Sequence, residues 1–147
     1  MADGVQIVCT HCDQVNRIPE GRPINQAKCG RCGQSLFDGH PAHLNDAGLS
    51  KQIERSDIPV VVDFWAQWCG PCRAMAPAFE QAAAAFGPSA RFVKVDVEKF
   101  KQVAGELGVQ GIPALFVFRG GEVVGRQTGA LSATAMYEWI KRTAAIG

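Results

Sequence analysis

The sequence predicts an α/β fold, in which a central mixed β-sheet carries helices on both faces and a small four-cysteine module precedes it. From about residue 44 onward, stretches with the periodicity of strands and helices alternate, which is typical of a sheet flanked by helices. The segment before residue 38 is rich in glycine and polar residues and has too few large apolar side chains to bury a core unaided. We therefore expect a module over residues 1–38 and a larger domain over residues 39–147, entered through a connector with solvent-facing histidines.

Two cysteine pairs organise the N-terminal module. Each pair has C-x-x-C spacing, and the stretch between the pairs falls in the length range of four-cysteine zinc sites. Four thiolates on one Zn²⁺ would supply the folding free energy that the module lacks, on the order of 10 kcal/mol in small zinc peptides. The expected zinc ligands are Cys9, Cys12, Cys29 and Cys32.

The module is expected to fold as a zinc ribbon. Short strands over residues 5–8 and 15–18 would join two knuckles, and Gly30 and Gly33 would allow the tight turns that aim backbone N–H groups at the sulfurs. His11 lies between two ligands and is an alternative to a cysteine, although the cysteine spacing fits zinc better. Nearby basic side chains could offset the charge of the zinc–thiolate group or could simply be solvated: Arg17, Lys28 and Arg31.

The first half of the larger domain is expected to contain two helices around a buried strand. Asn45 can cap a helix that runs to about residue 55, with apolar residues four positions apart on its buried face. Residues 60–66 form an apolar run that indicates a strand buried on both faces. A helix over residues 71–86 follows, and we expect Pro77 to kink it because proline removes a backbone hydrogen bond.

The alternation of strands and helices continues to the C-terminus. Residues 91–97 have strand character, and residues 100–107 indicate a helix. A hairpin over residues 114–127 turns at Gly120-Gly121, and Ser132 can cap a last amphipathic helix. This order of elements predicts the mixed sheet with helices on both faces.

A third cysteine pair, Cys69 and Cys72, follows directly after the buried strand. A strand that runs into a C-x-x-C pair is typical of a redox-active dithiol. Cys69 falls at the first turn of the next helix, where free N–H groups and the macrodipole favour an anion and lower a thiol pKa. Cys72 lies on the same helical face but deeper, so we expect Cys69 to attack and Cys72 to resolve. The alternative is half of a metal site, which would need two further ligands nearby.

Composition and the N-terminal residues restrict the location and the partners. A net charge of +1 gives no support for a nucleic-acid or membrane surface, and no apolar stretch approaches the length of a membrane span. The first residues lack the basic and apolar regions of a secretory signal, so we expect a cytoplasmic protein. Structural disulfides are rare there, so six cysteines in C-x-x-C pairs point to metal binding and redox catalysis.

Specific motifs of the chain closely resemble the thioredoxin family. They are the run Val62-Asp63-Phe64-Trp65-Ala66, the motif Trp68-Cys69-Gly70-Pro71-Cys72 and the later Gly111-Ile112-Pro113. The four-cysteine module looks like the extension of the zinc-binding bacterial thioredoxin 2 type. The resemblance implies a thioredoxin fold and a protein-disulfide reductase that an NADPH-dependent thioredoxin reductase recharges. It further implies disulfide-containing protein substrates, one structural zinc, no bound flavin or nicotinamide, and a monomer.

The resemblance also implies roles for single residues. Cys69 matches the family's nucleophile and Cys72 its resolving thiol. Asp63 matches the buried acid, and a carboxylate in an apolar strand has a raised pKa and can take the proton from Cys72. Lys94 matches a lysine that tunes this acid, with a plain surface lysine at an edge position as the alternative. The residues implied to form the substrate lip are Trp68, Gly70, Pro71, Ile112, the cis-proline Pro113, Gly129 and Ala130.

Two other functions remain open from the sequence. A disulfide isomerase or oxidase would use the same fold, although the Gly70-Pro71 dipeptide accompanies reducing members of the family. A redox-sensing zinc-ribbon interaction module would use the thiolate ligands, which are themselves oxidisable. Binding of nucleic acid is disfavoured, because residues 1–40 lack clustered basic and aromatic side chains.

Overall fold

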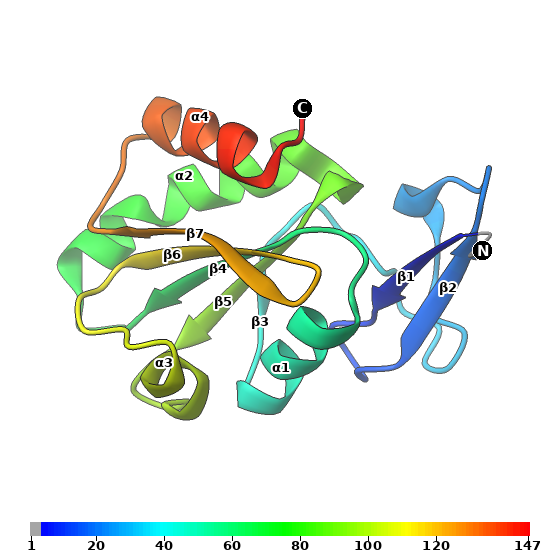
Figure 1. The fold of residues 1–147 in the computed structure, drawn as a ribbon, viewed down its shortest axis with the longest axis horizontal. Coiled ribbons are helices and arrows are strands. Elements are labelled where there is room, and N and C mark those ends of the chain that lie inside the picture. Colours follow the sequence, from blue (N-terminus) through cyan, green and yellow to red (C-terminus); the bar gives the residue numbers. More distant parts are fainter. Residues whose placement is uncertain (1–3) are drawn as a thin grey trace.

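The computed structural model describes residues 4–147 as a five-stranded mixed sheet with helices on both faces, and a two-stranded sheet at one end (Figure 1). The large sheet has the strand order β3-β5-β4-β6-β7. Its strands are β3 (Ala42–His43), β4 (Val60–Trp65), β5 (Arg91–Asp96), β6 (Ala114–Arg119) and β7 (Glu122–Thr128). The helices are α1 (Asp46–Arg55), α2 (Gly70–Phe86), α3 (Gln102–Glu106) and α4 (Ala133–Ala144), with 3-10 turns η1 (Ile24–Gln26) and η2 (Gly87–Ser89). The α/β fold expected from the sequence is confirmed.

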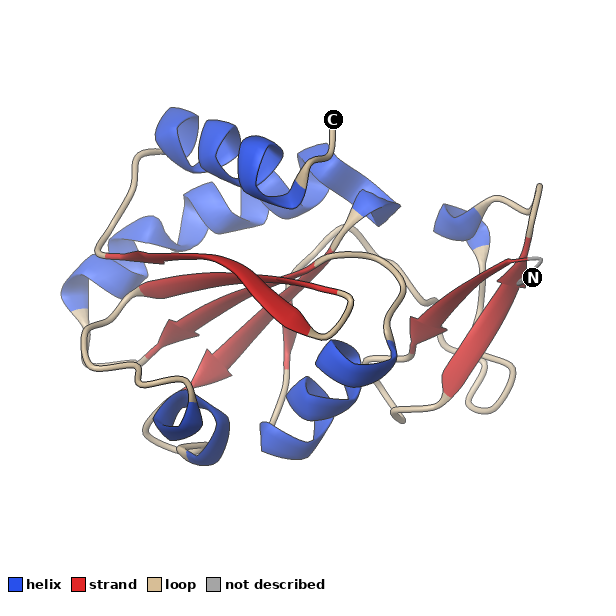
Figure 2. Ribbon diagram, in the orientation of Figure 1, coloured by secondary structure: helices blue, strands red, loops and turns tan. Residues whose placement is uncertain are grey.

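The helices form two layers, and each layer covers its own core. Helices α2 and α4 pack on one face of the sheet, and α1 and α3 lie on the other (Figure 2). Alternate side chains of β4 pack into one core or the other, because successive side chains of a strand point to opposite faces of the sheet. Val61 packs with α2 and α4, whereas Val62 and Phe64 pack with α1 and α3. The strand β4 is therefore buried on both faces, as the sequence predicted.

Two elements differ from the sequence-based expectation. Residues 42 and 43, expected to be part of a connector, form the short strand β3, which pairs in parallel with β5. The helix expected over residues 100–107 spans only Gln102–Glu106. Its start is fixed from outside, because the carboxylate of Asp46 on α1 accepts the N–H groups of Gln102 at 3.3 Å and Val103 at 3.0 Å. Such a long-range cap is invisible in the local sequence.

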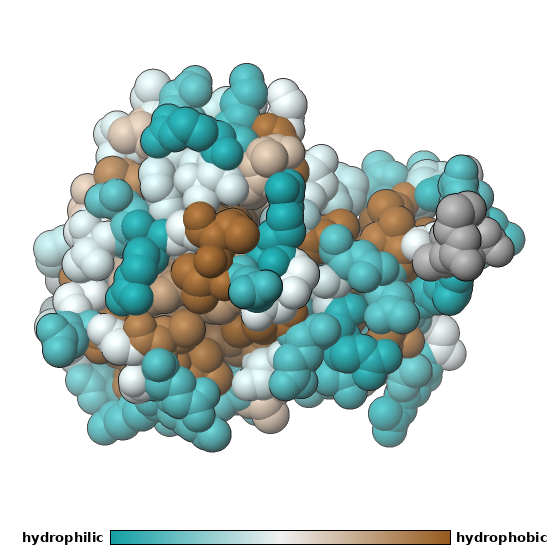
Figure 3. Space-filling model, viewed as in Figure 1, coloured by the Kyte–Doolittle hydropathy of each residue, from teal (hydrophilic) through white to brown (hydrophobic). Residues whose placement is uncertain are grey.

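The strand β7 forms one edge of the large sheet. Its side chains Val123 and Val124 are exposed, and apolar residues gather on the face of the molecule that Figure 3 shows. The pairing of β6 with β7 shifts register between Val117 and Phe118. A bulge of this kind twists an edge strand and makes it a poorer template for pairing with another chain.

The N-terminal module is a hairpin of β1 (Gly4–Val8) and β2 (Val15–Pro19) followed by a second cysteine turn. Its small core contains Ile7, Ile18 and Leu36, and Ile58 from the larger domain packs against it. The module lies at the end of the large sheet where β4 and β5 begin (Figure 1). The domain boundary at residues 38 and 39 stays a prediction.

None of the helices within residues 4–147 has the length and apolar character to cross a membrane.

Candidate functional site

The dithiol lies at the start of α2, just after the loop that connects β4 to this helix. Cys69 and Cys72 form a disulfide, with their Cα atoms 5.3 Å apart. Cys69 is the N-cap of α2 and so precedes the first helical turn in which the sequence analysis placed it. The backbone N–H of Cys72 donates to Sγ of Cys69 at 3.2 Å. Together with the positive end of the helix, this donor stabilises an anionic sulfur at Cys69 when the pair is reduced.

The surroundings of the dithiol are apolar. Ala66 is buried against the two cysteines, and Trp65 and Ile112 pack beside them. Cys69 has 4% of its surface exposed and Cys72 has 1%. Cys72 is the deeper of the two, as expected, but little of Cys69 is exposed in this oxidised form.

Two further loops approach the disulfide. The peptide bond between Ile112 and Pro113 is cis, and the carbonyl oxygen of Ile112 lies 3.9 Å from Sγ of Cys69. The N–H of Gly129 donates to the carbonyl of Pro113 at 2.9 Å and holds the third loop in place. Trp68 stands 66% exposed beside the dithiol. The remaining exposed members of the expected substrate lip are Gly70, Pro71 and Ala130.

Asp63 is a fully buried acid on β4. Its side chain points to the sheet face that α2 covers. It lies two residues after Val61, which packs under α2, and residues two apart on a strand share a face. Within residues 4–147 neither carboxylate oxygen has a hydrogen-bond partner. Burial raises the pKa of Asp63 to about 7, and the charge of Lys94 opposes this rise. A carboxyl group with this pKa gains and loses a proton near neutral pH.

Lys94 lies next to Asp63 on the neighbouring strand β5. The two residues are register partners in the parallel pair of β4 and β5. The alternative of a surface lysine at an edge is wrong, since β5 lies between β3 and β4 and only 8% of Lys94 is exposed. Its Nζ atom sits 4.6 Å from the centre of the Trp65 ring, a cation–π contact with a residue that itself packs against the dithiol.

The other four cysteines form a compact metal-binding cluster in the N-terminal module. Their Sγ atoms all lie within 4.8 Å of one another. The Sγ atoms of Cys9 and Cys32 are 3.7 Å apart, and those of Cys12 and Cys29 are 3.6 Å apart. Zn–S bonds of about 2.3 Å in a tetrahedron place the sulfurs about 3.8 Å from one another. The donor set and its spacing therefore fit a tetrahedral metal ion with four thiolate ligands.

Two equivalent knuckles build this cluster. In the first, the N–H of His11 donates to Sγ of Cys9 at 3.3 Å, and in the second the N–H of Arg31 donates to Sγ of Cys29 at 3.4 Å. The chain then turns at a residue with positive φ, Asp13 at 65° and Gly33 at 78°. The expected role of Gly30 in the tight turn is wrong, because its φ is not in the positive region.

The two knuckles give their first cysteines different environments. Burial raises the pKa of Cys9 to about 12, whereas N–H donors, that of Cys32 first, lower the pKa of Cys29 to about 6. A metal ion that binds Cys9 therefore has to displace the proton of this thiol. The side chain of His11 is not part of the cluster found within residues 4–147, so the structure gives no support for His11 as a ligand.

The dithiol and the metal cluster occupy opposite ends of the larger sheet. The module packs where β4 and β5 begin, and the dithiol follows the end of β4 (Figure 1). The six residues of β4 span roughly 20 Å at about 3.3 Å per residue. The cysteines of the dithiol and those of the module belong to separate packing clusters. In this structure the metal cluster does not touch the dithiol.

Three polar residues near these sites were missed by the sequence analysis. Glu98 accepts a hydrogen bond from Nε1 of Trp68 at 2.5 Å. Gln52 and Arg91 are buried between the module and the larger domain. Burial lowers the pKa of Arg91 to about 10, while Cys9 and Asp38 raise it, so the guanidinium stays charged at neutral pH. The sequence did contain a signal for their burial: Gln52 lies on the apolar face of α1, and Arg91 begins the apolar strand β5.

Comparisons with sequence families agree with both parts of the chain. A family model described as "Thioredoxin" matches residues 40–142, and a model described as "Thioredoxin 2, N-terminal" matches residues 8–34. Thioredoxin C-3 of Corynebacterium nephridii is 38% identical over 134 residues, which cover 91% of this chain and 92% of that protein. A thioredoxin of Rhodospirillum rubrum is 40% identical over 98 residues, or 67% of this chain and 94% of that protein.

A solved structure has the same fold. A thioredoxin variant from Halobacterium salinarum NRC-1 superposes with a TM-score of 0.64 and is 30% identical in sequence. The match covers 72% of this chain and 92% of that chain.

Proposed function

Since this chain belongs to the thioredoxin family and is a thiol–disulfide oxidoreductase, we propose that Cys69 opens the exchange with a protein disulfide and Cys72 completes it. The observation that carries the proposal is the position of the pair. Cys69 caps α2, receives the N–H of Cys72 and lies beside the Ile112 carbonyl. Cys72 lies deeper and within bonding distance of Cys69.

The first step of the proposed exchange is attack by the reduced Cys69. Its thiolate attacks one sulfur of the target disulfide, the target S–S bond breaks, and the second target sulfur leaves as a thiolate. The product is a mixed disulfide between Cys69 and the target. The electron pair comes from the thiolate, which the helix N-terminus and the N–H of Cys72 stabilise before the attack.

The second step releases the target. The thiol of Cys72 gives its proton to the carboxylate of Asp63, and the Cys72 thiolate attacks Sγ of Cys69. The mixed disulfide breaks, the target leaves fully reduced, and the chain ends with the Cys69–Cys72 disulfide seen here. A pKa of about 7 suits Asp63 to this transfer, because the group can accept a proton near neutral pH and return it. Lys94 acts as a positioning charge that keeps part of Asp63 ionised.

The target is proposed to bind across the three loops around the dithiol. Ile112 is half-buried beside Cys69, and its carbonyl can accept a hydrogen bond from an extended target backbone. The exposed Trp68 offers an apolar surface beside it, held in place by Glu98. The proposed contact residues are Trp68, Gly70, Pro71, Ile112, Pro113, Gly129 and Ala130.

The metal of the N-terminal cluster is proposed to be one structural Zn²⁺ held by Cys9, Cys12, Cys29 and Cys32. Four sulfurs at tetrahedral spacing favour zinc among common metals, and a filled shell leaves no position for water or substrate. When bound, zinc supplies a cross-link between the two knuckles, which a module with such a small core requires.

The location and the partners are proposed from the family and the sequence. An NADPH-dependent thioredoxin reductase would restore the dithiol in the cytoplasm, and disulfide-containing proteins would be the substrates of a monomer. The experiment is insulin reduction with thioredoxin reductase and NADPH. Turnover that depends on both supports the proposal, and a purified, folded chain without turnover contradicts it.

A further inference from the structure

The carbonyl of Val8 is held by two buried side chains from the larger domain. Val8 directly precedes the cluster residue Cys9 in the chain. Nε2 of Gln52 on α1 donates to this oxygen at 3.0 Å, and a terminal guanidinium nitrogen of Arg91 on β5 donates at 3.1 Å. Gln52 is fully buried and Arg91 is only 5% exposed. Two buried donors from separate elements therefore converge on the backbone that positions Cys9.

Gln52 is itself fixed in place. Its Oε1 atom accepts a hydrogen bond at 2.9 Å from the hydroxyl of Ser56, the C-cap residue of α1. The side-chain amide therefore has a partner for its oxygen and a partner for its nitrogen, both inside the protein. A buried amide satisfied in this way has one orientation, and that orientation aims the donor at Val8.

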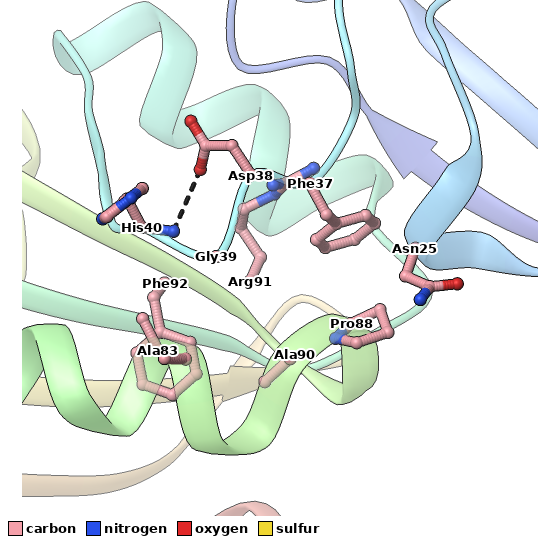
Figure 4. A pocket seen from close by; sticks show the side chains of 12 residues that line it. Asn25, Phe37, Asp38, Gly39, His40, Ala83, Pro88, Ala90, Arg91 and Phe92 are labelled. Atoms are coloured by element: carbon pink, nitrogen blue, oxygen red, sulfur yellow. Dashed lines mark hydrogen bonds between the residues drawn. The ribbon is translucent and has the colours of Figure 1, made fainter.

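Arg91 lies at the junction of the module and the larger domain. Its guanidinium stacks 4.2 Å from the centre of the Phe37 ring, and Asp38 and His40 lie near it around a cavity of about 370 Å³ (Figure 4). Its Nε atom has no hydrogen-bond partner in the described part of the chain. A buried cation is costly unless a negative charge lies close. The groups whose negative charge favours the charged form of Arg91 are Cys9, once it is a metal-bound thiolate, and Asp38.

The metal cluster needs such a cation. A divalent ion with four thiolates has a net charge of −2, and Cys9 is completely buried. The arginines and lysine of the module itself are all exposed to solvent, which screens their charges: Arg17, Arg22, Lys28 and Arg31. Arg91 is the buried guanidinium on the side of Cys9, where screening is weak.

Two further contacts tie the first knuckle to the larger domain. The backbone of Gln6 exchanges hydrogen bonds with Asp57, N–H to Oδ2 at 2.7 Å and carbonyl to N–H at 3.0 Å. Asp13, the turn residue of the first knuckle, approaches the first turn of α1. A Cβ atom on Gly48 would lie 3.4 Å from its Oδ1 atom. The docked position of the module thus depends on the knuckle conformation that the metal cross-links.

We propose that Arg91 is the buried counter-charge of the metal–thiolate cluster and, with Gln52, positions Cys9, so that metal binding and docking of the module onto the larger domain stabilise each other. This inference rests on the proposed occupation of the cluster by zinc. It assigns residues outside the zinc ribbon to the metal site. It also makes the stability of the larger domain depend on a metal that takes no part in the exchange.

The first test is the zinc affinity of Arg91 variants of the full chain. Zinc affinity is measured by competition with a chromophoric chelator at constant ionic strength. Arg91→Met should raise the zinc dissociation constant about 10- to 100-fold, as loss of outer-shell partners does in other metal sites. Arg91→Lys should recover part of this loss because it keeps the charge. Arg17→Met, which removes an exposed arginine of the module, should leave the affinity within about twofold of wild type.

A second variant separates the positioning role from the charge. Gln52→Met keeps the side-chain volume and removes one donor to Val8, so it should weaken zinc binding less than Arg91→Met does. Circular dichroism establishes that each protein is folded before titration. If Arg91→Met does not fold, Arg91→Lys and Gln52→Met carry the test. Wild-type zinc affinity in every folded variant of Arg91 and Gln52 would overturn the proposal.

The third test measures the mutual stabilisation directly. A double-mutant cycle combines Arg91→Met with Cys29→Ser, which removes a metal ligand, and the thermal midpoint of the larger domain is the readout. If Arg91 acts through the cluster, Arg91→Met should lower the midpoint clearly in the zinc-loaded protein and much less in the Cys29→Ser background. Equal shifts in both backgrounds contradict the coupling. Zinc analysis of the wild type distinguishes this result from failure of the proposed function, which would show as a chain without zinc.

Discussion

The dithiol and the metal cluster are built from the same C-x-x-C spacing and have different backbones after the second cysteine. After Cys72 the chain continues into α2, so the two sulfurs of the pair lie one helical turn apart and bond to each other. After Cys12 and Cys32 the chain reverses at Asp13 and Gly33, and each pair points its sulfurs toward the other pair. The path of the backbone, a helix that begins at Gly70 in one case and a reversal at Asp13 or Gly33 in the other, thus distinguishes the redox pair from the two metal knuckles.

The charges around the two sites also differ. Near the dithiol lies Asp63, a buried acid that is partly protonated at neutral pH and can exchange a proton. Near the metal cluster lies Arg91, a buried cation that stays charged. A disulfide exchange site needs a group that changes protonation, whereas a closed metal site needs a constant counter-charge. The comparison predicts that changes at one end of the sheet leave the chemistry of the other end intact.

The largest expected effect is at the dithiol itself. Cys69→Ser should lower disulfide reduction by at least about three orders of magnitude, because the nucleophile is gone. Cys72→Ser should also lose turnover, but it should accumulate a mixed disulfide with the target through Cys69, since the resolving thiol is missing. Non-reducing electrophoresis and mass spectrometry identify the trapped cysteine. Trapping by the Cys69→Ser protein through Cys72 would reverse the assignment, and both variants should still bind one zinc.

A smaller kinetic effect is expected for Asp63→Asn. The variant should form the mixed disulfide at a normal rate and resolve it about 100-fold more slowly near pH 7, because Cys72 has lost its proton acceptor. The difference should shrink above about pH 9, where a thiol loses its proton to solvent. Stopped-flow measurement of both steps from pH 6 to 10 checks this. Equal resolution rates across that range would remove Asp63 from the mechanism.

The same variant tests the buried acid through stability. The pKa of Asp63 is about 7 in the folded protein, against an ordinary value of 3.8 for a solvated aspartate in the unfolded chain. Between these pH values the folded protein holds a proton that the unfolded chain has lost. The stability that Asp63 contributes is complete below about pH 4 and is lost as the pH rises through about 7, by about 4 kcal/mol. Relative to wild type, Asp63→Asn should therefore gain stability between these pH values. Urea unfolding at pH 4, 6 and 8 measures it, and a parallel pH dependence of both proteins contradicts the raised pKa.

Lys94→Met should have a modest effect. Lys94 lowers the pKa of Asp63, so its removal should move the pH midpoint of the resolving step upward by less than about one pH unit. Lys99→Met is the matched control, because Lys99 is exposed and has no contact with Trp65 or Asp63. An unchanged midpoint in Lys94→Met, or an equal change in the control, would show that Lys94 does not tune Asp63.

Residues with strong local signals were predictable from the sequence. The apolar run of β4 into Cys69 and Cys72, the two knuckle pairs and the caps Asn45 and Ser132 depend on neighbouring residues only. These signals gave the fold class and both cysteine sites. The buried position of Asp63 also followed, because it lies within an apolar run that was expected to be a strand buried on both faces.

Features set by distant contacts were not predictable. The start of α3 depends on the carboxylate of Asp46, and β3 forms only because β5 provides an edge for it. The positive φ at Asp13 was not predictable, because the residue is not a glycine, the residue type that usually indicates such a turn. Gln52 and Arg91 gain their role from the Val8 carbonyl, which lies more than 40 residues away from either in the chain. Local sequence patterns contain no information about these pairs.

The most direct test of the separation between the two ends is the activity of Cys29→Ser. Its zinc content and its initial rate of insulin reduction are measured at a temperature where circular dichroism shows the larger domain folded. The variant should lose its zinc and its thermal stability should fall, yet its rate should stay within about twofold of wild type, because the cluster lies at the far end of the sheet. A rate that drops about tenfold or more in a folded, zinc-free protein would contradict a purely structural metal site.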